Sequence, residues 1–422
     1  MKTFLIGFVV LLLFGTPCFA QIHANDDLKS FDLVWATVNE TYFDPTFGGI
    51  DWKVRRDRYR PQIASSRGID EFNRITNRML FELGVSHLLV ATEKMLKTYM
   101  PTLFSEGTVG IDVRWLQNKA VITRLEPGFP GQKAGLKTGY EIEQIDGRDM
   151  DDIIRAAEVL PPFNGRNRRG GISNFIVGHL DGPPNTPVTV RYRDENASVK
   201  EATIIRRSRG AGRIISDAMP PVYIDFEAER LEGNVGYMRF NHFADPVDKQ
   251  FVYALETMRD TRGLIVDVRG NPGGYFRVVD TLIEQLITAK TPLYRFRFRD
   301  KTIERSLGPS KFPYAKPVVV LIDVTSMSSS EHFAACLQAI GRAAIVGERS
   351  PGYLLGAKWI KLPNGLSFMH AAFQPIASDG RIVEGHGVKP DLEIGLDRDD
   401  LLKGRDTQLE AALAYILEKS VP

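Results

Sequence analysis

The sequence predicts a mixed α/β protein in which a segment of short strands separates a helical N-terminal part from a larger α/β part. Apolar residues recur at helical spacing over residues 27–100. Short β-like runs alternate with turn signals over residues 105–207, and strands alternate with helices over residues 230–422. The last pattern is typical of a mostly parallel sheet.

The composition fits a folded chain with more than one domain. The 422 residues are 43% hydrophobic and 25% charged, which excludes a disordered or collagen-like protein. Lys and Arg number 54 against 52 Asp and Glu, so the net charge of +2 gives no electrostatic footprint for nucleic acid. We therefore expect no nucleic-acid partner.

The first 20 residues have the layout of a secretory signal peptide. Lys2 supplies the positive start, residues 4–14 form an apolar run, and Ala20 occupies the small-residue cleavage position. The apolar run is short for a membrane span. We expect an exported protein, periplasmic or secreted, with no stable membrane span after cleavage. Cys336 is then the only cysteine, so no internal disulfide can form.

The helical N-terminal part ends in a junction that carries a histidine. Its second helical pattern runs to Leu83, and Gly84 can end the helix. His87 follows, and the apolar run 88–90 comes directly after it. At such a helix-to-strand junction the backbone can direct a side chain into a cleft.

The middle segment contains a second recognisable pattern. Residues 128–150 read GFPGQKAGLKTGYEIEQIDGRDM and resemble the core of a bacterial-type PDZ domain. The backbone N–H groups of Val109, Gly110 and Ile111 would then bind a terminal carboxylate while the peptide adds as a strand. The alternative is a small β domain without a peptide site. Residues 160–185 are expected to form an irregular, solvated insertion.

Three stretches of the α/β part could carry chemistry. Residues 267–274 read DVRGNPGG, a Gly-rich turn after an apolar strand, which offers N–H donors for an oxyanion or only a tight turn. Residues 325–331 read TSMSSSE and join a strand to a helix, so a serine there projects from the strand end or caps the helix. Residues 382–391 read IVEGHGVKPD, a loop that holds a carboxylate and an imidazole.

Taken in this order, the three stretches resemble those of the tail-specific (C-terminal-processing) proteases and the tricorn core protease. The resemblance covers nearly the whole mature chain. It implies a crotonase-like β-α superhelical protease core, an inserted PDZ domain and peptide-bond hydrolysis without a metal. The implied domains are a signal peptide over 1–20, a helical N-terminal domain over 21–104, a PDZ domain over 105–207 and a serine protease core over 208–422.

The resemblance also implies the catalytic residues. The central serine of the family's S-x-S-x-S-E motif is the nucleophile, which corresponds to Ser328. Tail-specific proteases use a lysine as base, but Tyr353 stands at that position, and tyrosine titrates near 10. The tricorn-like branch uses a Ser-His pair and a glutamate, which correspond to His87 and Glu384. These three side chains would form a complete nucleophile, base and orienting carboxylate.

By the same resemblance, the backbone amides of Gly273 and Ser329 form the oxyanion hole, with Gly274 as the alternative to Gly273. Neither a cofactor nor a metal is expected, because the sequence has no H-x-x-x-H or Cys/His spacing. The sequence therefore predicts an exported serine endopeptidase acting on a peptide or protein with a free C-terminus, which the PDZ domain would bind.

Two alternatives remain at this level. The missing lysine favours a non-catalytic peptide- or ligand-binding protein on the same scaffold. A third hypothesis keeps the serine chemistry but uses Lys358, five residues after Tyr353, as the base.

Overall fold

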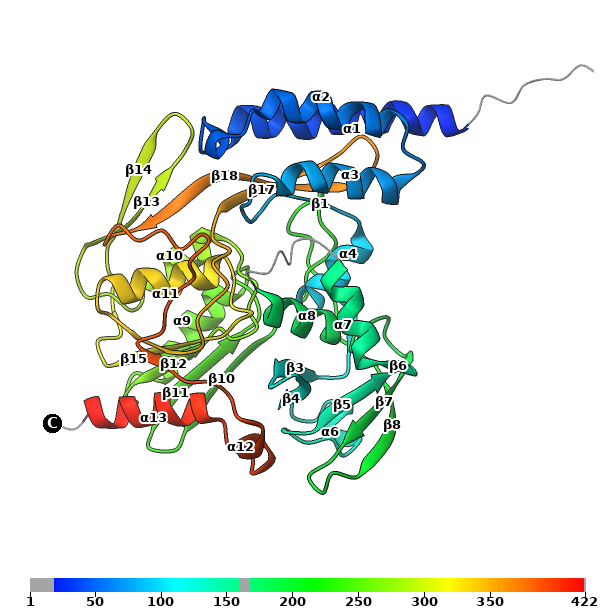
Figure 1. Ribbon diagram of the computed structural model, residues 1–422. Helices are drawn as coiled ribbons and strands as arrows, with labels where there is room; N and C mark the ends of the chain where they lie inside the picture. Colours follow the sequence, from blue (N-terminus) through cyan, green and yellow to red (C-terminus); the bar gives the residue numbers. More distant parts are fainter. Residues whose placement is uncertain (1–18, 160–166, 421–422) are drawn as a thin grey trace, which may run out of the picture.

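The computed structural model describes residues 19–159 and 167–420. Figure 1 shows the N-terminal helices lying across the top of the molecule, a small β domain at the lower right and the α/β part beside both. Residues 1–18 of the expected signal peptide lie outside the described residues. Within residues 19–159 and 167–420, no helix has the length and hydrophobicity needed to cross a membrane.

The N-terminal part consists of helices that share a hydrophobic cluster with a later β-hairpin. The buried Phe31 and Phe72 belong to the same cluster as Leu355 and Phe368. Strand β1 pairs antiparallel with β18 of that hairpin, in a sheet of order β1-β18-β13-β14 with β17 beside β18. The elements of this part are α1 (Phe19–Thr41), η1 (Phe47–Gly49), α2 (Trp52–Ala64), α3 (Ile69–Phe81), β1 (Leu89–Ala91), α4 (Glu93–Tyr99) and α5 (Pro101–Phe104).

The small β domain has a sheet of order β3-β4-β5-β7-β8 covered by two helices. Helix α8 corrects the expectation of an irregular insertion where residues 167–185 are concerned, and residues 160–166 lie outside the described residues. Its apolar residues, such as Ile172 and Phe175, are buried in the core of this domain. Gly170 allows a close approach to the loop after β15, because a Cβ there would lie 2.4 Å from the carbonyl oxygen of Val324. The elements are β2 (Gly107–Thr108), β3 (Ile111–Leu116), β4 (Lys119–Leu125), α6 (Pro130–Lys133), β5 (Glu141–Ile145), β6 (Arg148–Asp149), α7 (Met150–Val159), α8 (Arg168–Leu180), β7 (Pro187–Arg193), β8 (Val199–Ile205) and β9 (Arg207–Ser208).

The α/β part confirms the predicted alternation of strands and helices. Its sheet has the order β10-β11-β12-β15-β16-β19, and every pair after β10-β11 is parallel. The elements are β10 (Phe226–Leu231), β11 (Val235–Phe240), α9 (Val247–Thr257), β12 (Leu264–Asp267), α10 (Phe276–Glu284), β13 (Thr291–Arg297), β14 (Thr302–Leu307), β15 (Val318–Ile322), α11 (Ser329–Ala339), β16 (Ala344–Gly347), β17 (Gly356–Lys361), β18 (Ser367–Ala377), β19 (Leu392–Glu393), α12 (Arg398–Leu402) and α13 (Thr407–Lys419).

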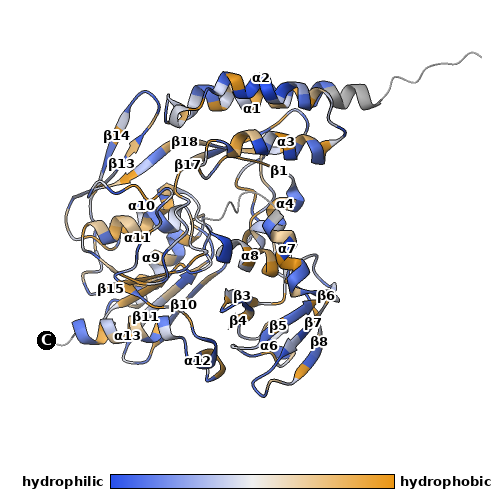
Figure 2. Cartoon of the chain, viewed as in Figure 1, coloured by the Kyte–Doolittle hydropathy of each residue, from blue (hydrophilic) through white to orange (hydrophobic). Residues whose placement is uncertain are grey.

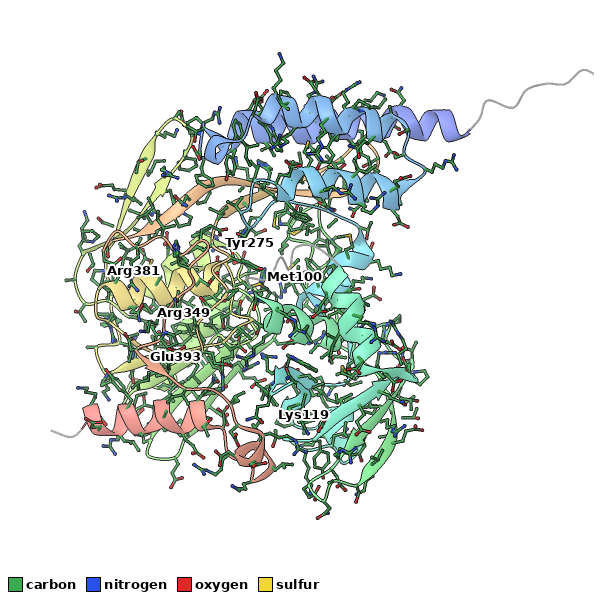
Figure 3. The ribbon with its side chains drawn as sticks, viewed as in Figure 1. Met100, Lys119, Tyr275, Arg349, Arg381 and Glu393 are labelled. Carbon is green, nitrogen blue, oxygen red and sulfur yellow. The ribbon has the colours of Figure 1, made fainter. Side chains whose placement is uncertain are left out.

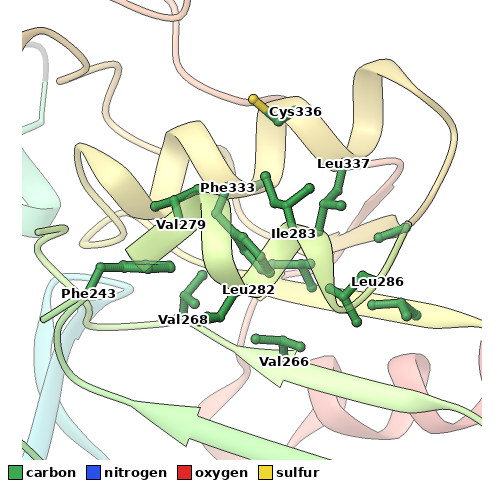
Figure 4. Close-up of a cluster of buried hydrophobic side chains, with 14 of the residues drawn as sticks. Phe243, Val266, Val268, Val279, Leu282, Ile283, Leu286, Phe333, Cys336 and Leu337 are labelled. Carbon is green, nitrogen blue, oxygen red and sulfur yellow. The ribbon is translucent and has the colours of Figure 1, made fainter. Parts of the chain in front are cut away.

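Both faces of this sheet are buried, which explains its continuous apolar strands. Alternate side chains such as Val266 and Val320 face α10 and α11, where Figure 4 shows the cluster that Leu282 and Phe333 complete. The intervening side chains, such as Ile265, pack with residues of α13 in a second cluster. Figure 2 shows these central strands as largely hydrophobic. This packing fixes the carboxyl ends of β12 and β15, where two of the predicted chemical stretches begin.

Candidate active site

Ser328 lies in the sharp turn between β15 and α11. Its backbone has a φ of 54°, a left-handed conformation that is rare for a residue with a side chain. The Ser328 N–H donates to the carbonyl of Tyr353 over 2.9 Å, which ties the turn to the segment before β17. The turn therefore holds the serine in one strained orientation at the start of a helix.

The side chain of Glu331, to which the sequence analysis assigned no role, holds this turn in place through hydrogen bonds. Its carboxylate is fully buried and accepts bonds from Ser350 Oγ (2.6 Å), Gly352 N (2.7 Å), Tyr353 N (2.8 Å) and Ser328 N (3.1 Å). Burial raises the pKa of this carboxyl to about 8, although the hydrogen bonds oppose the rise. The sequence contained one signal for this role of Glu331: it lies three residues after Ser328, which is the spacing of a helix-capping serine and its glutamate partner.

His87 lies beside the serine, although 241 positions separate the two residues. Its Nε2 is 3.1 Å from Ser328 Oγ. The pairing of β1 with β18 carries the histidine to this place, because His87 precedes β1 by two residues. Burial lowers the pKa of the imidazole to about 4, so the ring is neutral at pH 7 and can accept a proton.

Ser86 connects His87 with Glu384. The Ser86 hydroxyl is 2.6 Å from His87 Nδ1 and donates to Glu384 Oε2 over 2.7 Å, and the Ser86 N–H donates to Oε1 over 2.8 Å. The sequence analysis expected the Glu384 carboxylate to orient the imidazole, and the hydrogen bonds between the two run through Ser86. The Leu354 N–H also donates to Glu384 over 2.9 Å, which fixes the carboxylate.

These contacts determine which imidazole nitrogen carries the proton. Because Ser86 Oγ donates its own hydrogen to Glu384, it must accept a hydrogen from Nδ1 of His87. Nε2 then has a free lone pair directed at the hydroxyl of Ser328. The arrangement can remove the hydroxyl proton of Ser328.

The amides predicted for the oxyanion hole are not equally available. The Gly273 N–H donates to Asn271 Oδ1 over 2.9 Å, so the prediction for that amide is corrected. A Cβ on Gly273 would lie 2.7 Å from Ser328 Cβ, so this residue instead makes room for the serine. Gly274, the alternative, lines the same cavity as Ser328. Ser329 is the first residue of α11, and its N–H has no intrahelical acceptor.

A cavity of about 710 Å³ opens in front of Ser328 and His87. Its wall is mostly apolar and comes from all three parts of the chain. Figure 3 shows Met100 and Tyr275, two of its lining residues, in the region between the N-terminal helices and the α/β part. Its larger apolar side chains include Phe81, Met100, Leu103, Phe104, Ile215, Met219, Tyr275, Phe276, Trp359 and Met369.

Tyr353 and Lys358 both line this cavity, but they differ in their hydrogen bonds and in their exposure. The backbone carbonyl of Tyr353 accepts the Ser328 N–H, and the Tyr353 N–H donates to the Glu331 carboxylate. Lys358 lies on β17 with an exposed side chain. The hydrogen-bond partner of Ser328 Oγ is His87, which leaves the lysine without the contact that a general base requires in this conformation.

The residues predicted to bind a peptide terminus, Val109, Gly110 and Ile111, are buried. The Gly110 N–H donates to Thr108 Oγ over 2.9 Å. Helix α8 covers the open edge of β3, where Ser173 Oγ accepts the N–H of Trp115 over 3.0 Å. In this conformation the three residues do not reach the surface.

No group of three or more His, Cys, Asp or Glu side chains suited to a metal ion occurs within residues 19–159 and 167–420. Cys336 is buried in α11, and burial raises the pKa of its thiol well above the ordinary range.

Two parts of the chain match models of known protein families. Residues 234–394 match peptidase family S41, and residues 25–81 match the tricorn protease C1 domain. The α/β part thus has the sequence pattern of a peptidase domain of this family. Residues 234–394 are thus similar to the S41 peptidases, and residues 25–81 are similar to the C1 domain of tricorn protease.

The relatives differ in how much of their length is shared. The chain is 24% identical over 323 residues to carboxy-terminal processing protease CtpB of Bacillus subtilis, covering 75% of this chain and 61% of the relative. The carboxyl-terminal-processing protease of Synechocystis is 24% identical over 387 residues, with 90% and 84% covered. Tricorn protease homolog 1 of Streptomyces coelicolor is 24% identical over 406 residues, with 92% and 35% covered. The chain thus spans less than two thirds of the Bacillus and Streptomyces proteins.

Solved structures share the fold. The photosystem II D1 C-terminal processing protease has a TM-score of 0.55 at 19% identity, covering 94% of this chain and 98% of the other. Mature CPAF has a TM-score of 0.60 at 13% identity, covering 94% and 97%. Tricorn protease has a TM-score of 0.51 at 18% identity, covering 94% of this chain and 37% of its own.

Proposed function

We propose that the protein is a serine endopeptidase in which Ser328 attacks the scissile carbonyl of a peptide. The single observation that carries this proposal is the 3.1 Å contact between Ser328 Oγ and the unprotonated Nε2 of a neutral His87. His87 takes the hydroxyl proton as the bond to the carbonyl carbon forms. It returns this proton to the leaving amine when the peptide bond breaks.

Ser86 and Glu384 act on the imidazole rather than on the substrate. As His87 becomes positively charged, its Nδ1–H bond to Ser86 strengthens, and the Glu384 carboxylate balances the charge through the Ser86 hydroxyl. We propose the amides of Gly274 and Ser329 as the oxyanion donors. The helix dipole of α11 adds to their effect, because its positive end lies at Ser329. Water then hydrolyses the acyl-enzyme by the same steps.

The remaining features of the proposal concern the substrate and its delivery. We propose that the core, residues 208–422, is a crotonase-like protease domain, that residues 105–207 form a PDZ domain that binds C-termini, and that 21–104 form a helical domain. Binding at Val109–Ile111 would require α8 to move away from β3, because Ser173 and Arg169 now bond to Trp115. We also propose export of the mature chain, since its first 20 residues have a signal-peptide pattern.

Labelling with a fluorophosphonate followed by peptide mapping tests the proposal. We expect modification at Ser328 that is lost in Ser328→Ala and strongly slowed in His87→Ala. The matched control is Ser378→Ala, a serine of the same chain that does not line the cavity. Failure to label Ser328, in the presence as well as the absence of a peptide with a free C-terminus, would favour the non-catalytic binding protein. Labelling that survives His87→Ala but not Lys358→Ala would favour the lysine as base.

A further inference from the structure

The methionines of this chain fall into two groups that differ in exposure. Of the ten methionines, only Met1 lies outside the described residues. Four are buried, with exposed fractions of 8% or less: Met79, Met150, Met238 and Met258. The other five are partly exposed: Met95, Met100, Met219, Met327 and Met369. All of these five except Met95 line the active-site cavity, so the methionines that solvent reaches are concentrated at one place in the fold.

Four of the partly exposed methionines pack against one buried hydrophobic cluster, and we call them the thioether cluster: Met95, Met100, Met219 and Met369. They come from separate segments, namely α4 and the residue after it, the loop before β10, and β18. The β17–β18 register places Met369 opposite Trp359, which also lines the cavity and packs against the same buried cluster. The side chains of the thioether cluster therefore contribute to the apolar wall.

The other sulfur groups of the described chain are placed differently. Met327 directly precedes Ser328 and belongs to the nucleophile loop, where its N–H donates to the Asn271 carbonyl over 3.0 Å. Cys336, the one thiol within the described residues, is buried. Burial raises the pKa of this thiol well above its ordinary range and keeps it protonated, and a protonated thiol reacts poorly with oxidants. Oxidants therefore meet thioethers at the cavity before they meet a thiolate.

We propose that the thioether cluster is a modification site for hydroperoxides, at which sulfoxide formation weakens the binding of apolar substrates in the cavity. In this reaction a sulfur lone pair attacks one peroxide oxygen, and the S–O bond forms as the O–O bond breaks. The transferred oxygen gives its proton to the leaving oxygen, which departs as water or an alcohol. The sulfur is oxidised by two electrons and the peroxide is reduced by two.

A sulfoxide changes the chemistry of the apolar wall. Its oxygen is a hydrogen-bond acceptor, and an apolar side chain packed against it offers no donor. Covering this oxygen with substrate therefore costs free energy that covering a thioether does not, because the thioether is itself apolar and adaptable. The effect on peptide binding rests on the proposed peptidase function, which places the peptide in this cavity, whereas the modification itself does not.

Oxidation of the folded full chain with hydrogen peroxide, followed by peptide mapping in a mass spectrometer, locates the sulfoxides. We expect the thioether cluster to be oxidised at least about tenfold faster than the buried Met79, Met238 and Met258, because access limits the reaction. In the chain unfolded in urea, all of these methionines should react at similar rates. Similar rates in the folded protein, or oxidation confined to Met327, would overturn the proposal.

Binding of an apolar peptide to the Ser328→Ala protein, measured by fluorescence anisotropy, shows the consequence without hydrolysis. We expect oxidation to raise Kd about tenfold, and treatment with methionine sulfoxide reductases A and B to restore it. A four-leucine variant should bind within about threefold of its parent, since leucine has a similar volume, and should no longer respond to peroxide. It combines Met95→Leu, Met100→Leu, Met219→Leu and Met369→Leu. The matched control, Met150→Leu, replaces a buried methionine outside the cavity lining and should respond as its parent does.

A Kd that oxidation leaves unchanged, or that rises equally in the four-leucine variant, would also overturn the proposal. The peptide map and the reductase step use the natural methionines, so both remain decisive if the four-leucine variant does not fold. Failure of the peptidase proposal is visible separately, because the unoxidised protein then neither binds nor hydrolyses the peptide. Binding of the apolar dye N-phenyl-1-naphthylamine to the cavity then replaces the peptide, with the same expected loss on oxidation.

Discussion

Arg114 of the small β domain and Asp323 at the end of β15 form a buried ion pair, with 2.8 Å between Nε and Oδ2. Asp323 also accepts bonds from the Thr325 N–H and hydroxyl, at 2.9 and 2.7 Å, and so shapes the loop that leads to Ser328. Although burial opposes it, Arg114 holds the pKa of Asp323 at about 2. The β domain is thus joined to the nucleophile loop by charge.

Arg114→Met should lower activity as well as stability. Removing the guanidinium leaves the Asp323 carboxylate buried and unpaired, which costs about 3 kcal/mol or more in a typical buried pair. The loop should relax, and we expect kcat to fall about tenfold or more, while the free energy of unfolding drops. Urea unfolding and steady-state kinetics measure the two effects.

The control for this prediction is Arg155→Met, which breaks an exposed pair with Asp152 in the same β domain. Exposed pairs contribute about 1 kcal/mol or less, so both measurements should stay near wild type. Unchanged kcat in Arg114→Met would show that the β domain does not support the loop.

Ser86→Ala tests the bridge between His87 and Glu384. Without the hydroxyl, Nδ1 of His87 loses its acceptor and the carboxylate loses its route to the ring. We expect kcat to fall about 10²- to 10⁴-fold with little change in KM, as for triads whose orienting group is removed. Glu384→Gln should have a similar effect, and the double variant should be little worse than either single one, because the two groups act as one unit. Additive losses would contradict the bridge.

The pH at which kcat falls on the acidic side of the pH–rate profile should lie below the ordinary pKa of histidine. His87 must be neutral to accept the proton, and burial lowers its pKa from 6.5 to about 4. We therefore expect kcat to change less than about twofold between pH 7 and pH 5, and to fall as the pH approaches about 4. A half-maximal kcat near pH 6.5 would show that the imidazole is solvated in the working enzyme.

The lowered pKa of His87 also predicts the direction in which stability changes with pH. Between pH 6.5 and about 4 the unfolded chain binds a proton at His87 that the folded protein does not, so stability falls as the pH drops through this window. The urea midpoint of wild type should therefore decrease more steeply with acidity than that of His87→Gln. Equal slopes would contradict the lowered pKa.

Gly273→Ala should inactivate the enzyme through crowding of the nucleophile. The new Cβ would lie 2.7 Å from Ser328 Cβ and 2.8 Å from Ser329 N, and the φ of 108° is unfavourable for alanine. We expect fluorophosphonate labelling of Ser328 to fall at least about tenfold because the serine must move. Gly308→Ala is the control, since a Cβ there meets nothing within 4 Å, and it should label normally.

Much of the fold could be read from patterns that are local in the chain. The central strands are continuous apolar runs because both faces of the sheet are covered, and the turn residues between them are Gly-rich. Helix α8 was missed because Gly170 and Gly171 have poor helix propensity, whereas packing of its apolar residues in the core of the β domain stabilises a helix there. Propensity is a weak guide wherever tertiary contacts decide.

The sequence by itself indicated the mixed α/β class, and its resemblance to the tail-specific and tricorn proteases implied roles for Ser328, His87 and Glu384. Only the tertiary structure decided how they connect. The bond from Ser86 to Glu384 joins residues 298 positions apart, and the bond that occupies the Gly273 amide depends on the orientation of the Asn271 side chain. Hydrogen bonds require donor and acceptor within about 3 Å, and no spacing along the chain specifies that distance between separate segments.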